Sequence, residues 1–306
     1  MTLTSIRESI LAVGTIVNVK VVCQIGQETL YREKLTKSLT MFYEVENLFS
    51  RFKSNSELMK VSHHVNLPVV VSPTFFEVMN YALTLSNLTN GAFDPTLGKK
   101  LEKYGFNQKY ETGERIESKI ADEPVSYRDI VLNEERRTVT LLKPILLDFG
   151  AIAKGFAIDL CAKMLAEATG FYIDAGGDIF VSGINEEGSK WKVGIRHPMN
   201  KNQNVRVIQL TDAAICTSGS YERFNPKSNI HHLLIPDSGR PQNSLLSCTV
   251  IAPFGMMADS FSTAAFIMGE KDGLSFLEDM GVSGIMVTSD LRVRQTLKMK
   301  ELIVCK

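Results

Sequence analysis

The spacing of hydrophobic residues along the chain predicts five helices. Between residues 29 and 49, apolar side chains recur every three or four positions, at Leu35, Leu39, Phe42 and Val45. That is the period of a helix with one buried face. Similar spacing recurs in four other segments. The predicted helices cover residues 29–49, 73–88, 150–169, 257–268 and 271–280.

Shorter runs of β-branched and other apolar residues predict strands between these helices. The first run, residues 10–23, contains a glycine, so we expect two neighbouring strands there. The other expected strands cover residues 130–132, 139–142, 171–174, 179–183, 190–196, 205–210, 230–235, 246–252, 284–288 and 291–297. Because strands outnumber helices without alternating regularly with them, the pattern favours an α+β fold with mixed or antiparallel sheets and packed helices.

The composition is that of a globular protein with a large core. The chain has 306 residues, of which 44% are hydrophobic, and we expect residues 1–306 to form one unit, with two lobes as an open alternative. Lys plus Arg and Asp plus Glu both number 34, so overall charge gives no reason to expect nucleic-acid binding. No apolar run approaches the roughly 18 residues that a membrane span needs.

The cysteines and the first residues favour a cytoplasmic location. The cysteines are scattered and form no CxxC pair, which argues against a disulfide framework and a zinc site. They are Cys23, Cys161, Cys216, Cys248 and Cys305. The chain also begins without the basic segment and apolar core of a signal peptide. We therefore expect a cytoplasmic protein, with an exported form whose leader has been trimmed as the open alternative.

Asp259 and Thr263 form the most informative pair of polar residues. They stand four positions apart in a predicted helix, so both oxygens lie on one face. Two hard oxygen ligands at this spacing suit a partly hydrated Mg²⁺ that also contacts a phosphate. Taken alone, the pair also fits ordinary chemistry at the start of a helix.

Residues 146–156 predict an apolar strand that turns through Gly150 into a helix. Free N–H groups at such a helix start attract phosphate, and Lys154 lies one turn into the helix. Asp148 follows the strand as either a site residue or a capping residue. Gly155 inside the helix costs about 1 kcal/mol relative to Ala, which indicates that another segment packs closely against it.

Three further segments could contribute to a site. Asp174 and Asp178 flank a Gly-Gly pair that allows close approach of a ligand, or simply forms a tight hairpin. His231 and His232 would point to opposite faces of a strand, so one could face a cleft as a general base. Residues 91–98 place Phe93 beside Asp94. This pair could contact a flat ring and its polar edge, or Phe93 could simply be a hydrophobic residue that caps the loop. GxGxxG and GxxxxGK[ST] are absent, which argues against a Rossmann site and a P-loop.

Taken together and in this order, these segments resemble the ApbE family of FAD:protein FMN transferases. The resemblance spans nearly the whole chain. The matching segments cover residues 49–58, 91–98, 147–159, 174–178, 191–198, 217–224, 231–241 and 250–269. Each is a weak signal alone, but the ordered set is specific.

The resemblance implies an α+β enzyme that binds FAD and Mg²⁺. Such enzymes move the FMN part of FAD to a Thr or Ser hydroxyl of a client flavoprotein and release AMP. The metal would be held by Asp259, Thr263 and the backbone carbonyl of Ala151. FAD would contact Ala92, Phe93, Asp94, Asp148, Lys154, the turn that ends at Asp178, and the main chain at Leu233. His232 matches the position linked to base chemistry.

The chain departs from the family pattern at two positions. Val13 stands where the family usually has Met, and Ile235 precedes Pro236 where Asp is common. These departures keep two other functions open. One is an Mg²⁺-dependent FAD pyrophosphatase that yields FMN and AMP with water as the acceptor. The other is a non-catalytic FAD-binding protein.

Overall fold

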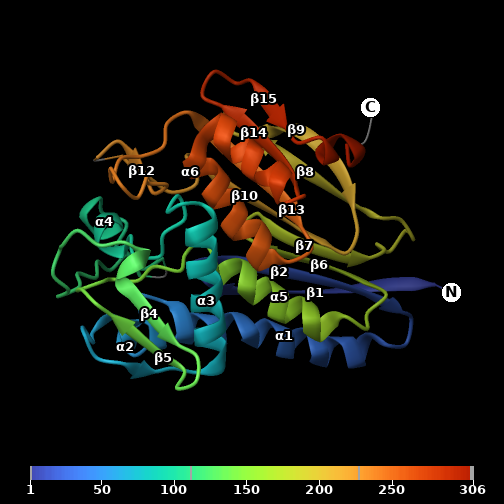
Figure 1. Ribbon diagram of the computed structural model, residues 1–306. Helices are drawn as coiled ribbons and strands as arrows, with labels where there is room; N and C mark the ends of the chain where they lie inside the picture. The colour runs from blue at the N-terminus through green and yellow to red at the C-terminus, as the bar shows by residue number, and fades with distance from the viewer. Residues whose placement is uncertain (1, 111, 227, 304–306) are drawn as a thin grey trace.

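One antiparallel sheet forms the centre of the fold. The computed structural model describes residues 2–110, 112–226 and 228–303. Within these ranges the sheet has the order β1-β2-β6-β7-β10-β13-β14-β15, with antiparallel neighbours throughout (Figure 1). Its strands are β1 (Leu3–Ala12), β2 (Thr15–Gln24), β6 (Gly170–Ala175), β7 (Asp178–Gly183), β10 (Ala213–Gly219), β13 (Leu245–Ala252), β14 (Ser283–Thr288) and β15 (Val293–Gln295).

Both faces of this sheet are covered. Three helices pack on one face: α1 (Glu28–Phe49), α5 (Ala153–Leu165) and α6 (Gly255–Asp279). The hairpin of β8 (Trp191–His197) and β9 (Asn200–Leu210) contributes to a second core on the other face. Neighbouring residues of one strand therefore enter different cores: Val21 lies in the first and Val22 in the second. The resulting α+β architecture confirms the predicted fold class.

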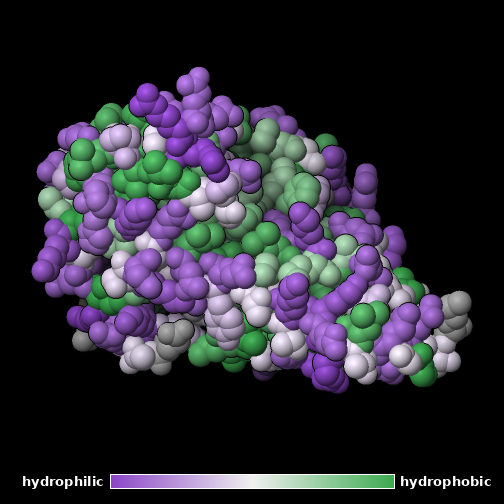
Figure 2. Space-filling view, turned by 90° about the horizontal axis from the view of Figure 1, so that it is seen from below, coloured by the Kyte–Doolittle hydropathy of each residue, from purple (hydrophilic) through white to green (hydrophobic). Residues whose placement is uncertain are grey.

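A group of short elements lies at the side of the sheet, around α3 (Figure 1). The helices there are α2 (Glu57–Ser62), α3 (Pro73–Leu88), α4 (Gly98–Lys103) and the 3₁₀ turn η1 (Tyr127–Asp129), with a small sheet of β3 (Val69–Val70), β5 (Thr138–Leu141) and β4 (Ile130–Asn133). The remaining elements are β11 (Phe224–Asn225), β12 (Ile230–His231) and the 3₁₀ turn η2 (Lys298–Glu301). Among the described residues, no helix is long and apolar enough to cross a membrane. Seen from below, the surface is largely hydrophilic with smaller hydrophobic patches (Figure 2).

The helix predictions are close to the structure, with two differences. The predicted helix 150–169 is shorter, because residues 150–152 form the turn that precedes α5. The two helices expected over 257–268 and 271–280 are joined in α6. They meet at Gly269, which has φ 84° and ψ −173° and so interrupts the helical geometry. A positive φ of this kind favours glycine.

Two strand predictions need correction, and some strands were not predicted. Only Ile230–His231 of the expected strand 230–235 is a strand, since the chain then turns back on itself and Leu234 pairs with Pro241. The apolar run before Asp148 is extended and buried, but it pairs with no strand in the described ranges. Leu147 N–H donates to Ser62 Oγ at the end of α2, and Asp148 N–H donates to Pro95 O in a loop. Strands β3, β10 and β11 were not predicted.

The starts of α5 and α6 meet at two glycines. A Cβ atom built on Gly155 would lie 2.3 Å from the carbonyl oxygen of Gly255, and one on Gly255 would lie 2.6 Å from the oxygen of Gly155. Neither distance is possible for a real side chain. The close approach predicted from the helical glycine is therefore confirmed, and its partner is the other helix.

At this crossing each helix supplies a carboxylate to the start of the other. Asp259 Oδ2 of α6 accepts a hydrogen bond from Gly155 N–H at 3.0 Å. Asp159 of α5 accepts from Gly255 N–H at 2.5 Å and from Met256 N–H at 2.9 Å. The carboxylates thus satisfy N–H groups that a helix start leaves without partners. Burial raises the pKa of Asp159 to about 6, and the charge of Asp259 adds to this rise. The hydrogen bonds from the two N–H groups act in the opposite direction and lower the pKa.

Replacing Gly155 with Ala should destabilise the protein although Ala is the better helix former. The added methyl group would overlap the backbone of α6 and force the helices apart, an overpacking effect of about 1–3 kcal/mol. Chemical denaturation of Gly155→Ala should show this loss. Lys163→Ala, an exposed change in the same helix, should stay within about 0.5 kcal/mol of wild type. A Gly155→Ala protein as stable as wild type would contradict the tight crossing.

The raised pKa of Asp159 predicts a specific pH dependence of stability. Between pH 4 and 6 the folded protein binds a proton at Asp159 more tightly than the unfolded chain, so the free energy of unfolding should fall as pH rises through this window. The full effect is at most about 3 kcal/mol for a shift of about two pKa units. Asp159→Asn should lack this component when urea unfolding is measured at pH 4.5 and 7.5, whereas the exposed control Asp279→Asn should keep it. Parallel curves for wild type and Asp159→Asn would contradict the assignment.

Candidate active site

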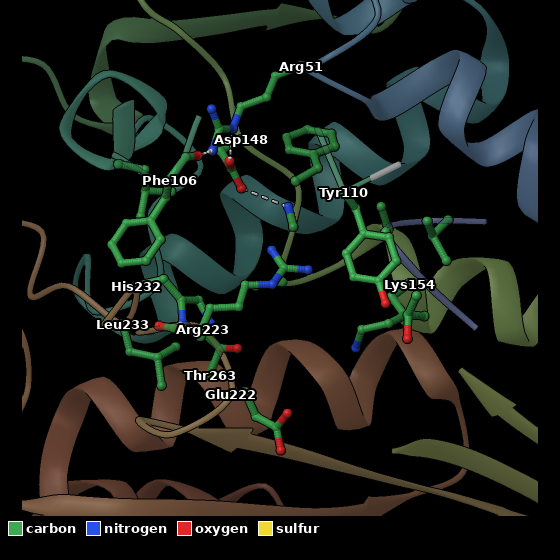
Figure 3. A pocket seen from close by; sticks show the side chains of 18 of the residues that line it. Arg51, Phe106, Tyr110, Asp148, Lys154, Glu222, Arg223, His232, Leu233 and Thr263 are labelled. Atoms are coloured by element: carbon green, nitrogen blue, oxygen red, sulfur yellow. Dashed lines mark hydrogen bonds and ion pairs between the residues drawn. The ribbon is translucent and has the colours of Figure 1, made fainter. Parts of the chain in front are cut away.

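A cavity of about 1020 Å³ opens where the β1–β2 turn, the end of α1 and the starts of α5 and α6 meet. This volume is at the upper end of the range for ligand pockets. Parts of segments far apart in the sequence line it: residues 13–15, 45–53, 92–101, 105–110, 113–115, 148–154, 175–178, 217–226, 232–234 and 259–267. Figure 3 shows Arg51 and Asp148 on one side of the cavity and Thr263 on the other.

An ammonium group lies between two carboxylates at the base of α5. Lys154 forms an ion pair with Asp178, and its Nζ is 3.6 Å from Asp259 Oδ2. Asp178 and Asp259 are only 3% and 5% exposed. Asp178 Oδ1 also accepts from Thr217 N–H at 3.0 Å. The three charged side chains together carry a net charge of −1, from one positive and two negative groups.

The three predicted metal ligands line this one cavity. Thr263 Oγ1 lies 2.8 Å from the hydroxyl of Ser218. Ala151 O would accept from Gly155 N–H in a regular helix, but that N–H donates to Asp259 instead. Within the described ranges, no backbone N–H donates to Ala151 O. The same ranges contain no metal-holding group of three or more His, Cys, Asp or Glu residues.

Asp148 is held by a buried ion pair. Arg51 Nε donates to Asp148 Oδ2 at 2.5 Å, and Gly150 N–H donates to Oδ1 at 2.8 Å. Burial alone would raise the pKa of Asp148, but the charge of Arg51 and these hydrogen bonds bring it below its usual value. The N–H groups of Gly150 and Gly155, expected to be free at this helix start, are therefore already used within the protein.

The two histidines lie in different environments. His231 is 5% exposed and packs edge-on against Phe266, whereas His232 lines the cavity. The prediction that only one of the pair faces a cleft is confirmed. His232 Nδ1 lies 3.3 Å from the carbonyl oxygen of Arg223. Because a carbonyl only accepts, Nδ1 is the donor and Nε2 is left as the acceptor. Burial, together with the charge of Arg223, lowers the pKa of His232 to about 3.

The other predicted FAD contacts also line the cavity, but several are engaged within the protein. Asp94 accepts from both the N–H and the hydroxyl of Thr96 and from Tyr127 N–H. Phe93 is 4% exposed and belongs to the core beside Ala92. The N–H of Leu233 donates to His231 and its carbonyl accepts from Gln242 N–H. Their side chains, more than their polar groups, shape the cavity wall.

Among the cavity residues that sequence reasoning missed are Arg51, Phe106, Tyr110 and Arg223. Arg223 Nη2 lies 4.0 Å from a Cβ built on Gly14, so it reaches the β1–β2 turn. Arg51 gives one signal in the sequence, a charged residue between Phe49 and Phe52 directly after a helix. Tyr110 lies in a charged, turn-rich segment that carries no pattern.

Comparison with known proteins agrees with this geometry. The chain matches the ApbE family over residues 13–286. It is 30% identical to an FAD:protein FMN transferase of Haemophilus influenzae, over 83% of this chain and 78% of the relative. The Vibrio cholerae FAD:protein FMN transferase is also 30% identical, over 90% of this chain and 84% of the relative. The ApbE protein of Thermotoga maritima has a similar crystal structure, with a TM-score of 0.86, 27% identity, and coverage of 99% of this chain and 100% of that one. The chain belongs to the ApbE family.

Proposed function

We propose that this chain is an FAD:protein FMN transferase that uses Mg²⁺ and attaches FMN to a Thr or Ser hydroxyl of a client flavoprotein, releasing AMP. The observation that carries the proposal is the joining of Asp259, Thr263 and His232 in one large cavity of an ApbE-family chain. The names of the relatives support FAD as the substrate. Mg²⁺ and the type of hydroxyl are parts of the proposal.

The donor groups of the cavity fit Mg²⁺. Asp259, Thr263 and the carbonyl of Ala151 would hold it, and all three supply the hard oxygen atoms that this ion prefers. The carbonyl accepts no backbone hydrogen bond in the described ranges, and the neighbouring Lys154–Asp178–Asp259 group has excess negative charge. When bound, Mg²⁺ would neutralise charge on the pyrophosphate of FAD.

In the transfer step, the client hydroxyl oxygen bonds to the phosphorus on the FMN side of the pyrophosphate. The bond from this phosphorus to the bridging oxygen breaks, and AMP leaves with that oxygen. His232 Nε2 accepts the hydroxyl proton, because Nδ1 donates to the Arg223 carbonyl. Lys154 offers a positive charge close to the reacting phosphates. Positioning and charge neutralisation supply most of the rate in phosphoryl transfer.

The direct test mixes the enzyme, FAD, Mg²⁺ and a client flavoprotein domain. We expect a fluorescent, flavin-modified client and one AMP per modification, seen by in-gel fluorescence and chromatography. A client with Ser at the acceptor position should still be modified, and one with Val should not. Asp259→Asn keeps an acceptor for Gly155 N–H but loses the charge, so activity should fall about 10²-fold or more. Asp272→Asn, an exposed change in the same helix, is the control.

Two results of this test would replace the proposal. AMP production with an unmodified client would identify an FAD pyrophosphatase. Tight FAD binding with AMP release at the background rate would identify a flavin-binding protein. Full activity of Asp259→Asn would overturn the metal assignment.

The cytoplasmic location expected from the sequence stays a prediction.

The base assignment predicts a difference between the two histidines. His232→Ala should lower the transfer rate by about 10²–10⁴-fold, the usual contribution of a general base, while the dissociation constant for FAD changes little. His231→Asn keeps an acceptor for the N–H of Leu233 and should have a much smaller effect on the rate. Single-turnover kinetics and fluorescence titration would measure both quantities. An equal loss of rate in the two variants would mean that His232 is not the base.

A further inference from the structure

Arg51 connects three separate segments that line the cavity. Its side chain, 9% exposed, follows directly after α1 and lies over the ring of Phe52, with 4.4 Å from the guanidinium carbon to the ring centre. Nε donates to Asp148 before α5, and Nη2 donates to the carbonyl of Phe106 in the loop after α4. One guanidinium group thus ties this loop to the start of α5.

Phe106 in turn contacts the proposed base. Its ring and that of His232 meet edge to face, with centres 6.1 Å apart and planes at 66°, a favourable aromatic geometry. The backbone of Phe106 is held on both sides: its N–H donates to Leu101 O at 3.0 Å, and its carbonyl accepts from Arg51. In the described ranges, Arg51 is the one side chain that donates to this carbonyl.

We propose that Arg51 is a positioning residue, which holds Phe106 against His232 and so keeps one side of the imidazole covered where it borders the cavity. The proposal rests on the proposed function for the role of His232. Arg51 suits the task because a guanidinium donates in two fixed directions at once, whereas the ammonium of Lys is a single point charge. The Arg51→Lys substitution keeps the charge beside Asp148 but cannot reproduce the hydrogen bonds to both Asp148 and Phe106.

The loop has anchors besides Arg51. Asn107 Nδ2 donates to Ile116 O at 2.9 Å, Ile116 N–H donates to Asn107 O, and Phe106 N–H remains bonded to Leu101. Loss of the Arg51 contact therefore frees the Phe106 ring without removing these anchors. Water could then reach the side of His232 that Phe106 covers. The charged and titratable neighbours of His232 are Arg223, His231 and Asp148. Better hydration of the charged imidazole raises its pKa.

The first experiment measures the titration of His232 directly in the ligand-free protein. Histidine-labelled protein is titrated by NMR from pH 8 to 5, and His232 is assigned by the signal lost in His232→Gln. In wild type this imidazole should stay neutral throughout, and in Arg51→Lys it should titrate towards the ordinary pKa of 6.5. Arg128→Lys is the matched control, because its guanidinium also lies over an aromatic ring, 4.5 Å from the centre of Tyr127, but outside the cavity. Identical titrations of wild type and Arg51→Lys would overturn the proposal.

The second experiment uses flavin transfer. The kcat of Arg51→Lys should be about tenfold lower at pH 5.5 than at pH 8, as expected for a base with a pKa of 6.5, while wild type and Arg128→Lys stay nearly constant. Phe106→Leu should produce the same profile, and the double variant should add little to it. A uniform loss at all pH values would indicate a merely structural role and overturn the proposal. If wild type itself transfers no flavin, the proposed function fails, and the NMR titration still decides the role of Arg51.

Discussion

The contact between Gly155 and Gly255 is the constraint on which the site depends. Because neither residue has a side chain, the helix starts approach until their backbones touch. Only at this distance can Asp259 of one helix reach the N–H of the other. The same bond removes the usual donor from the carbonyl of Ala151 and sets Asp259 beside Lys154. Packing and electrostatics at the site therefore have one origin.

The distribution of charge gives the two sides of the cavity different roles. Arg51 and Asp148 balance each other, so this pair adds no net charge and serves to hold structure. The group of Lys154, Asp178 and Asp259 has one positive and two negative charges. An uncompensated negative charge that is largely buried is unfavourable, and it would also repel the phosphates of FAD. A bound divalent cation would resolve both problems, which supports the proposal that metal and substrate share this group of residues.

Local patterns in the sequence predict the parts of this site that lie within one element. The i, i+4 spacing predicts that Asp259 and Thr263 lie on one face of a helix. The low helix propensity of glycine alone marks Gly155 as a point of close contact. The extended run before Asp148 could not be distinguished from a strand, because burial gives both the same apolar pattern. Arg51 and Phe106 are 55 residues apart in sequence, and nothing local indicates that they meet. Residues whose role arises from such tertiary pairing require the structure.

The surroundings of His232 indicate how the proposed chemistry divides between base and charge. The residue before Pro236 is the apolar Ile235, and Nδ1 of His232 bonds to a main-chain carbonyl. A neutral partner orients the ring but stabilises its charged form less than a carboxylate would. As the proposed base, His232 would therefore be weak, and its lowered pKa would keep it unprotonated over a wide pH range. Phosphoryl transfer through a loose transition state tolerates a weak base, since the attacking oxygen retains its proton until late. In the proposed reaction, neutralisation of the phosphate charge would then carry the larger part of the catalysis.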